Sequence, residues 1–351
     1  MRLFPNWHPV APHLALREYV RQLEPEFSLL FRGHENPAQW AEGLRAKLRE
    51  LAGWPDARCD LQVRELDVTR CEGYARSRLV YTVEPGVDAV AWLCVPHGLQ
   101  EPVPAVICAH HRGPGRDEIM GLTGFPDPRR GCGLANTLAQ AGYVVLAPDA
   151  RCFGERLGDE SGLAVAGAVL GTPLAGRQAW DLSRAVDVLL ERADVRARRI
   201  GLVGFGMGAQ HGLLTAALDD RLYCTALCGG QTTLRELLVA GNCADGLILA
   251  GDLLPGLLQW ADLDDVACLA APRALMSLQP LPDAGVPEAG AREFAERVTA
   301  GFEVLGEQVK LEALVEPAGS LDCTATIARF LDDWLKLPEP EGQEQLSNKP
   351  A

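Results

Sequence analysis

Short hydrophobic runs recur along the chain and predict the strands of a sheet. The runs are residues 61–68, 77–83, 90–95, 105–109, 143–147, 200–203, 223–227, 274–278 and 311–315. The last six are apolar almost throughout, which is typical of parallel strands that are covered on both faces. The second and third runs are separated by the turn signal Glu-Pro-Gly-Val-Asp, so we expect antiparallel strands at the start of the sheet.

Apolar residues with helical spacing fill the intervals between the later runs. Leu182, Val186 and Leu189 form one such stripe, and Phe294 with Val298 begins another. Strands that alternate with helices predict an α/β fold. We therefore expect a mostly parallel central sheet with antiparallel N-terminal strands and with helices on both faces.

Changes in pattern along the chain suggest its organisation. Residues 1–60 are expected to form an N-terminal helical extension, and residues 61–337 the α/β domain. Within that domain the stretch 229–269 is longer than a simple crossover, which predicts a lid or insert over the sheet edge. Residues 338–351 are polar and are expected to form a disordered tail.

Charge and cysteine usage exclude several classes of function. The formal net charge is −14, which opposes nucleic-acid binding and docking on an anionic membrane. No apolar run is long enough to predict a transmembrane helix, and no secretory signal is visible at the N-terminus. The cysteine count of 11 is odd and several cysteines lie inside apolar runs. This usage predicts a reducing, cytoplasmic compartment.

The segment Gly204-Phe205-Gly206-Met207-Gly208 carries the most specific pattern in the chain. It joins a predicted strand to a predicted helix, which is where a G-x-S-x-G nucleophile elbow would stand, but its central residue is Gly206. A glycine has no side chain and cannot form an acyl-enzyme. Residues 204–209 also fit the dinucleotide-binding fingerprint G-x-G-x-x-A. That hypothesis is disfavoured because at least two parallel strands come earlier and no acidic residue follows the next strand.

Several motifs in order resemble those of the acetyl-xylan-esterase and dienelactone-hydrolase-like branch of the α/β-hydrolase superfamily. They are the strand and loop 142–156, the segment 180–187 before the elbow, and the segments 257–263 and 271–273. The resemblance spans roughly residues 40 to 336. It implies an α/β-hydrolase fold and a Ser-His-Asp triad of an ester hydrolase.

When that triad is mapped onto this chain, the acid is present, but the serine and the histidine are replaced by other residues. Asp283 stands where the family has its acid, whereas Gly206 replaces the serine and Ser320 replaces the histidine. The resemblance also implies an oxyanion hole near Met207, His111 and Arg112, where His111 replaces a usual glycine. These substitutions predict a degenerate catalytic triad.

Several other reactive residues also have structural interpretations. His110 and His111 offer a displaced base, but a hydrogen-bonded loop pair is the favoured interpretation, and His211 is interpreted as a packing or surface residue. Cys152 and Cys323 are interpreted as inert thiols rather than substitute nucleophiles. A mainly structural ion-pair cluster is expected from Asp149, Arg151, Glu155 and Arg156. The spacing predicts no metal site and no cofactor.

Three hypotheses for function remain open. The first is a catalytically inactive homologue that binds a small ester or acyl ligand, or a partner, at the carboxyl edge of the sheet. The second is an active carboxylic-ester hydrolase with rewired catalytic residues. The third is a structural role in an assembly, in which the chain forms a homo-oligomer.

Overall fold

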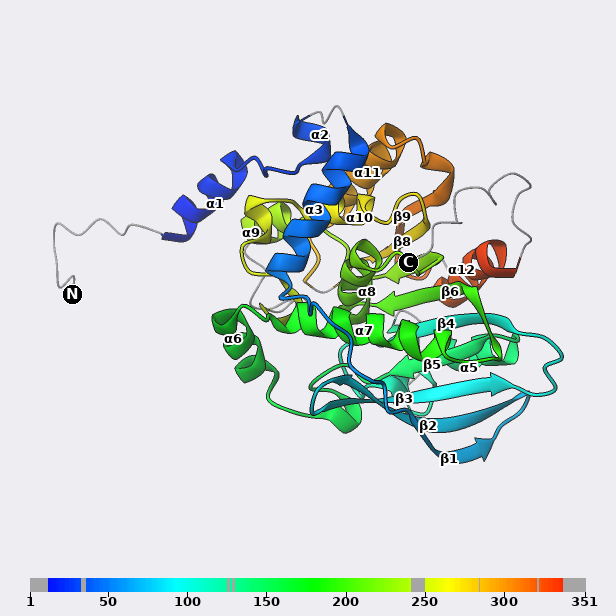
Figure 1. The fold of residues 1–351 in the computed structure, drawn as a ribbon. Coiled ribbons are helices and arrows are strands. Elements are labelled where there is room, and N and C mark those ends of the chain that lie inside the picture. The colour runs from blue at the N-terminus through cyan, green and yellow to red at the C-terminus, as the bar shows by residue number, and fades with distance from the viewer. Residues whose placement is uncertain are drawn as a thin grey trace, which may run out of the picture.

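A computed structural model describes residues 12–32, 36–124, 127, 130–240, 250–283, 285–320 and 322–336. Its centre is one nine-stranded sheet with the order β1-β2-β3-β5-β4-β6-β7-β8-β9 (Figure 1). The strands are β1 (Arg64–Arg70), β2 (Tyr74–Glu84), β3 (Val87–Pro96), β4 (Val103–Ala109), β5 (Val144–Pro148), β6 (Val195–Phe205), β7 (Cys224–Cys228), β8 (Ala274–Leu281) and β9 (Leu311–Pro317). The predicted fold class is confirmed.

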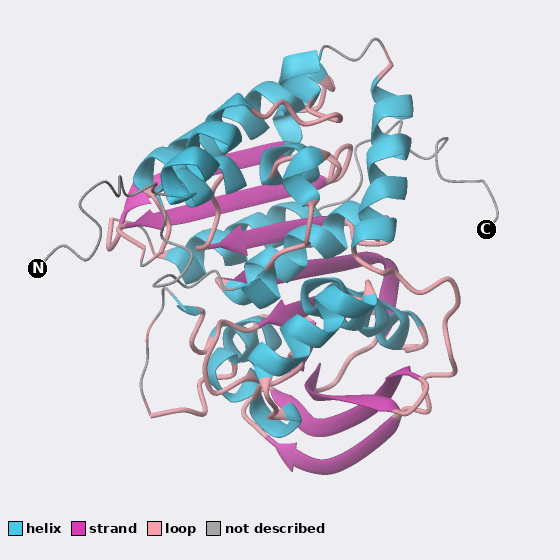
Figure 2. Cartoon of the chain, turned by 90° about the vertical axis from the view of Figure 1, so that its left-hand side faces the viewer, coloured by secondary structure: helices cyan, strands magenta, loops and turns pink. Residues whose placement is uncertain are grey.

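Strand direction follows the burial pattern of the sequence. β1 pairs with β2, β2 with β3 and β3 with β5 in antiparallel register, whereas β4 to β9 pair in parallel. The parallel strands β5, β7 and β8 are buried along their whole length, but every residue of the edge strand β1 is exposed. At the bottom of Figures 1 and 2, β1–β3 form one end of the sheet.

Helices lie on both faces of the sheet (Figure 2). They are α1 (Pro12–Gln22), α2 (Leu29–Arg32), α3 (Pro37–Leu51), α4 (Arg116–Ile119), α5 (Leu134–Gln140), α6 (Glu160–Leu170), α7 (Leu174–Leu190), α8 (Met207–Leu218), α9 (Leu234–Ala240), α10 (Leu263–Cys268), α11 (Glu288–Val304) and α12 (Cys323–Leu331). No helix in these described ranges is long and apolar enough to cross a bilayer.

Alternate strand residues supply the two faces of the core. On one face, Val106 and Cys108 of β4 pack in a cluster with α5 and α12. On the other, Ala105 and Ile107 pack in a cluster with α7. Each fully buried Leu, Ile or Val stabilises the fold by about 1.5–3 kcal/mol. Helices therefore cover both faces of the parallel part of the sheet, as the uninterrupted apolar runs predict.

The N-terminal helix α3 is part of the same core. Asn36 caps its first turn by accepting from the N–H groups of Ala38 and Gln39. Its buried residues Leu44 and Leu48 belong to the cluster that contains α8, α10 and α11. The segment predicted as an N-terminal extension thus contributes to the packing behind the elbow helix. The predicted tail 338–351 lies outside the described residues.

Candidate functional site

The turn from β6 into α8 has the backbone of a nucleophile elbow. Gly206 caps α8 with φ +51° and ψ −111°, and its N–H donates to the carbonyl oxygen of Cys228 over 2.8 Å. This φ lies in the left-handed region, which favours glycine. The hydrophobic sequence of α8 buries all 12 of its residues, so the helix is fixed against the sheet.

The flanking glycines are required by close backbone approach. A Cβ at Gly204 would lie 2.3 Å from the carbonyl oxygen of Gly208, and a Cβ at Gly208 would lie 2.4 Å from that of Ala109. No side chain larger than hydrogen fits between β4, β6 and the first turn of α8. The G-x-G-x-G pattern therefore encodes this packing whether or not the central residue is reactive.

The ring of His111 lies where the side chain of an elbow nucleophile would begin. A Cβ at Gly206 would stand 2.4 Å from Cδ2 and 2.6 Å from Nε2 of His111. Its Nδ1 lies 2.9 Å from the carbonyl oxygen of Arg112, which can only accept, so Nδ1 carries the proton. Burial lowers the pKa of His111. At neutral pH the imidazole is therefore uncharged, and its Cδ2–Nε2 edge lies closest to the elbow.

Asp283 lies close to the elbow, at the carboxyl end of β8. Its Oδ2 accepts from the N–H of Gly230 over 3.0 Å and from Nε2 of Gln279 over 2.9 Å. A Cβ at Gly229 would lie 3.4 Å from this oxygen and 3.8 Å from the nitrogen of Gly206. The fold thus brings the acid position and the elbow to one place, as the resemblance implies.

Ser320 lies in an exposed turn after β9. Its hydroxyl donates to the carbonyl oxygen of Pro317 over 2.7 Å and lies 3.5 Å from a carboxylate oxygen of Glu316. These hydrogen bonds stay within its own turn and do not link it to Asp283 or Gly206. Ser320 therefore has the geometry of a turn residue.

The residues expected around an oxyanion hole have different roles. Met207 is the first residue of α8, so its N–H has no partner within the helix. The guanidinium of Arg112 is turned to the carboxylates of Glu160 and Asp252, the latter 2.8 Å away. Met207 can therefore contribute a backbone donor, whereas the Arg112 side chain is held in an ion-pair network.

The remaining candidate histidines are buried beside the elbow. His110 donates from Nδ1 to the carbonyl oxygen of His111 over 2.7 Å and accepts at Nε2 from the N–H of Ala150 over 2.9 Å. Burial also lowers the pKa of His110. His211 lies with Nε2 3.5 Å from an Oδ1 oxygen of Asp252. His110 has the geometry of a hydrogen-bonded loop residue, and His211 joins the network around Arg112.

The candidate cysteines are buried thiols. Cys152 has φ +75°, and burial raises the pKa of its thiol. Cys323 is also buried, and its hydrogen bond raises the pKa of Cys228, as does burial. A raised pKa lowers the thiolate fraction and hence the nucleophilicity. Within the described ranges, no three His, Cys, Asp or Glu side chains converge as metal ligands.

The expected ion-pair cluster is present and is larger than the sequence indicates. Arg116 pairs with Asp149 and Glu155, while Arg151 and Arg156 both pair with Asp181. Asp149 also accepts from the N–H of Glu155 over 3.0 Å. The network therefore fixes the loop after β5 to the loop after β4. The partners Arg116 and Asp181 lie far from it in sequence, and no local signal identifies them.

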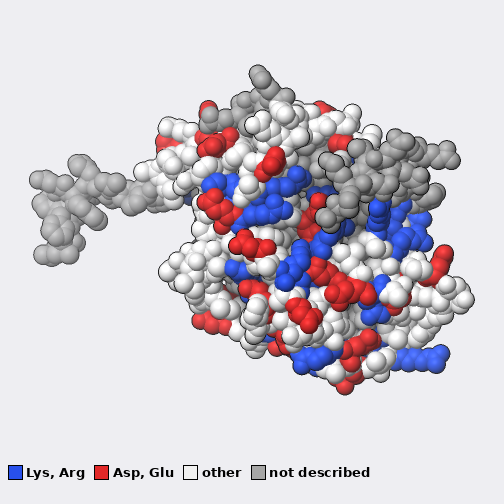
Figure 3. Space-filling model, viewed as in Figure 1, with Lys and Arg blue, Asp and Glu red and all other residues white. Residues whose placement is uncertain are grey.

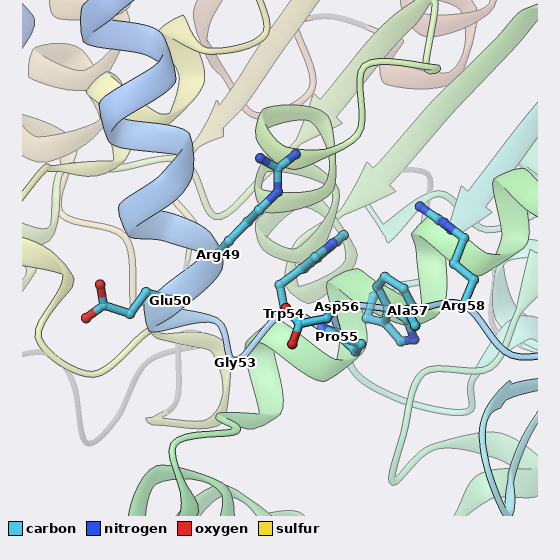
Figure 4. A pocket seen from close by; sticks show the side chains of 9 residues that line it. Arg49, Glu50, Gly53, Trp54, Pro55, Asp56, Ala57 and Arg58 are labelled. Atoms are coloured by element: carbon cyan, nitrogen blue, oxygen red, sulfur yellow. The ribbon is translucent and has the colours of Figure 1, made fainter. Parts of the chain in front are cut away.

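A cavity of about 530 Å³ opens elsewhere, after the end of α3. Its lining includes Arg49, Trp54, Arg58 and Trp180, and Figure 4 shows Arg49 and Arg58 on either side of Trp54. The ring of Trp54 packs edge-on against that of Trp180, with centroids 5.2 Å apart. No residue of the elbow, the loop after β4 or the Asp283 loop lines this cavity. We therefore place the candidate site at the elbow.

Comparisons with known proteins give sequence similarity to hydrolases. Residues 91–246 match the dienelactone hydrolase family. YtaP of Bacillus subtilis (strain 168), described as a candidate hydrolase, is 29% identical over 307 residues, covering 84% of this chain and 99% of YtaP.

Solved structures share the fold at low sequence identity. A candidate acetyl xylan esterase of Bacteroides fragilis NCTC 9343 has a TM-score of 0.72 and 17% identity, covering 91% of this chain and 85% of that protein. A glucuronoyl esterase from Solibacter usitatus has a TM-score of 0.62 and 15% identity, and the match covers 89% of this chain and 98% of that protein.

Proposed function

We propose that this chain belongs to the acetyl-xylan-esterase and dienelactone-hydrolase-like branch of the α/β-hydrolase superfamily and that it forms no acyl-enzyme. It is of the hydrolase or esterase type in sequence and fold. Its own role is to bind a small ester or acyl ligand, or a partner, at the carboxyl edge of the sheet. The ten described cysteines are free thiols, which supports a reducing, cytoplasmic location.

One observation carries this proposal. The elbow residue is Gly206, and the ring of His111 fills the space in which a nucleophile's Cβ would stand. The site therefore lacks the atom that attacks the ester, and the volume for that atom is occupied. The turn of Ser320 offers no imidazole to Asp283. Without nucleophile and base, the acyl transfer of the family cannot start.

The test combines turnover with covalent labelling. We expect the protein to hydrolyse p-nitrophenyl acetate no faster than buffer that contains imidazole at the same concentration as the protein. We also expect intact-mass spectrometry to show no adduct with a fluorophosphonate probe. A serine esterase handled in parallel provides the positive control. Stoichiometric labelling together with turnover would overturn the proposal.

A second candidate rests on the position of His111. Its neutral Nε2 lies 2.6 Å from where a Cβ at Gly206 would stand, so it is placed to act as a general base toward water at the elbow. Water would attack the ester carbonyl, Nε2 would take the water proton, and the departing alkoxide would recover that proton. This route needs no covalent intermediate.

The two candidates differ in a measurable way. Water activation predicts turnover without labelling, loss of that turnover in His111→Gln, and little change in the matched variant His97→Gln, whose ring lies near an exposed turn. The non-catalytic function predicts no turnover in any of the three proteins. Turnover that survives His111→Gln would contradict the water-activation route.

A further inference from the structure

An unusual hydrophobic surface lies on and beside α6. The described residues include 13 large hydrophobic side chains that are exposed, and five of them fall between residues 157 and 170. The five are Leu157 (83% exposed), Leu163 (48%), Val165 (66%), Val169 (81%) and Leu170 (74%). Scattered exposed hydrophobics are ordinary, but a contiguous group marks an interaction site. We call these five residues the α6 patch.

In α6 the apolar residues face outward and the charged residue faces inward, the opposite of the arrangement in a solvent-exposed helix. Gly162, Val165, Ala166 and Val169 follow i, i+3, i+4, i+7 spacing and share the outward face. The charged residue of the helix, Glu160, instead faces inward and pairs with Arg112. A helix exposed to water normally places its charges outside, so this outward face is built for contact with another apolar surface.

The anchorage of α6 shows that this face is held outward. The Asp159 side chain caps the first turn by accepting from the N–H of Gly162 over 2.9 Å. At the inner face, Gly167 is buried, and a Cβ there would lie 2.6 Å from the carbonyl oxygen of Thr172. The helix cannot rotate to hide its outer stripe without losing the close contact at Gly167 and the ion pair of Glu160.

We propose that the α6 patch is the contact surface of a homodimer in which α6 packs against α6 of a second copy about a two-fold axis. This proposal is independent of whether the elbow is catalytic. A two-fold interface must be complementary to itself, and an uncharged helix face with small residues at Gly162 and Ala166 meets that requirement.

Charge restricts where a second copy can bind. Two chains of net charge −14 repel each other, so their contact must avoid like charges. The α6 patch contains no charged residue, and in Figure 3 the surface at the place of α6, on the left edge of the described part of the chain, is mostly white. The same net charge opposes binding to an anionic bilayer.

The size of the patch suits a weak to moderate dimer. A Leu or Val side chain offers on the order of 100 Å² of apolar surface, so the five exposed side chains together present roughly 350 Å². Two copies that bury this surface would together hide roughly 700 Å², which is below the roughly 1,200–2,000 Å² of standard interfaces. We therefore expect weak, reversible association.

Sedimentation velocity of the full chain over a concentration series tests the proposal. The wild type should shift from monomer to dimer, and Val165→Glu with Val169→Glu should weaken dimerisation about tenfold or more, because each dimer would bury unpaired carboxylates. Val309→Glu is the matched control, since Val309 is 82% exposed but lies far along the chain in a different surface segment. It should leave the dimer unchanged.

Three results would overturn the proposal. They are a wild type that stays monomeric to hundreds of micromolar, a dimer that persists in the double variant, and flotation of the wild type with phosphatidylcholine or phosphatidylglycerol vesicles through the α6 patch. Far-UV circular dichroism and a thermal melt of each variant verify that the fold is retained. A double variant that fails to fold is replaced by Val169→Lys, which carries the same expectation.

Discussion

Restoring a serine at the elbow is expected to destabilise this protein, because its Cβ would meet the ring of His111. In Gly206→Ser, the new Cβ would lie 2.4 Å from Cδ2 and 2.6 Å from Nε2 of His111. Real Cβ atoms do not approach other heavy atoms so closely, so the ring or the turn must shift. The residue would also keep φ +51°, which strains any side chain.

The magnitude follows from these two effects. Positive φ costs a non-glycine residue about 1–2 kcal/mol, and overpacking of a filled site costs about 1–3 kcal/mol. We expect Gly206→Ser to lower the free energy of unfolding by about 2–5 kcal/mol. Equilibrium denaturation in urea at neutral pH, with the slope m monitored for two-state behaviour, measures this change.

A matched variant separates the cost of backbone strain at positive φ from the cost of the contact with His111. Gly86 has φ +79° in an exposed turn, and nothing lies within 4 Å of a Cβ added there. Gly86→Ser should therefore lose only the backbone contribution of about 1–2 kcal/mol. The excess loss in Gly206→Ser measures the contact with His111.

A double-mutant cycle identifies the colliding partner. The pair Gly206→Ser and His111→Gly should show a favourable coupling energy of about 1–3 kcal/mol, because removal of the ring makes room for the serine. A coupling near zero, or Gly206→Ser as stable as Gly86→Ser, would refute the placement of the His111 ring at the elbow. A fluorophosphonate adduct on Gly206→Ser alone would refute it as well.

Three further results follow from the described contacts. Asp283→Ala should lower the free energy of unfolding by about 1–3 kcal/mol in urea denaturation, because the buried N–H of Gly230 loses its acceptor and Gln279 Nε2 keeps only the carbonyl oxygen of Pro280. Asp56→Ala, at an exposed position, serves as control and should change the free energy of unfolding by less than about 0.5 kcal/mol. Hydrogen bonds from Arg78 and then Arg116 lower the pKa of Glu155 to about 2, below its ordinary value of 4.5, so the stability it contributes is present above pH 4.5 and is lost as the pH falls toward 2. Glu155→Gln should flatten that part of the pH dependence of stability, and an unchanged acid limb would contradict the ion pairs. Treatment of the native protein with iodoacetamide at pH 8 should modify, among the described cysteines, only the half-buried Cys59, Cys71 and Cys132, as detected by peptide mass. The buried cysteines should react slowly, since burial raises the pKa of Cys94, for example, to about 12. Rapid modification of Cys152 or Cys323 would contradict their description as inert thiols.

The sequence by itself determined the sheet and the frame of the elbow. All nine predicted strands are present. The uninterrupted apolar runs of β5, β7 and β8 identify strands that are covered on both faces, and these strands are buried along their whole length. The glycines at 204 and 208 were likewise readable, since backbone approaches of 2.3–2.4 Å tolerate no side chain. These features depend on residues that are neighbours in the chain, where pattern and periodicity carry the information.

Tertiary structure alone decided what surrounds Gly206. The sequence placed His111 in the loop after β4 but could not show that its ring fills the nucleophile's space, because that contact joins residues 95 positions apart. The ion pairs of Arg112 with Glu160 and Asp252 likewise join residues that are 48 and 140 positions apart. Side-chain packing between remote segments depends on the relative placement of whole elements, and local sequence patterns do not encode that placement.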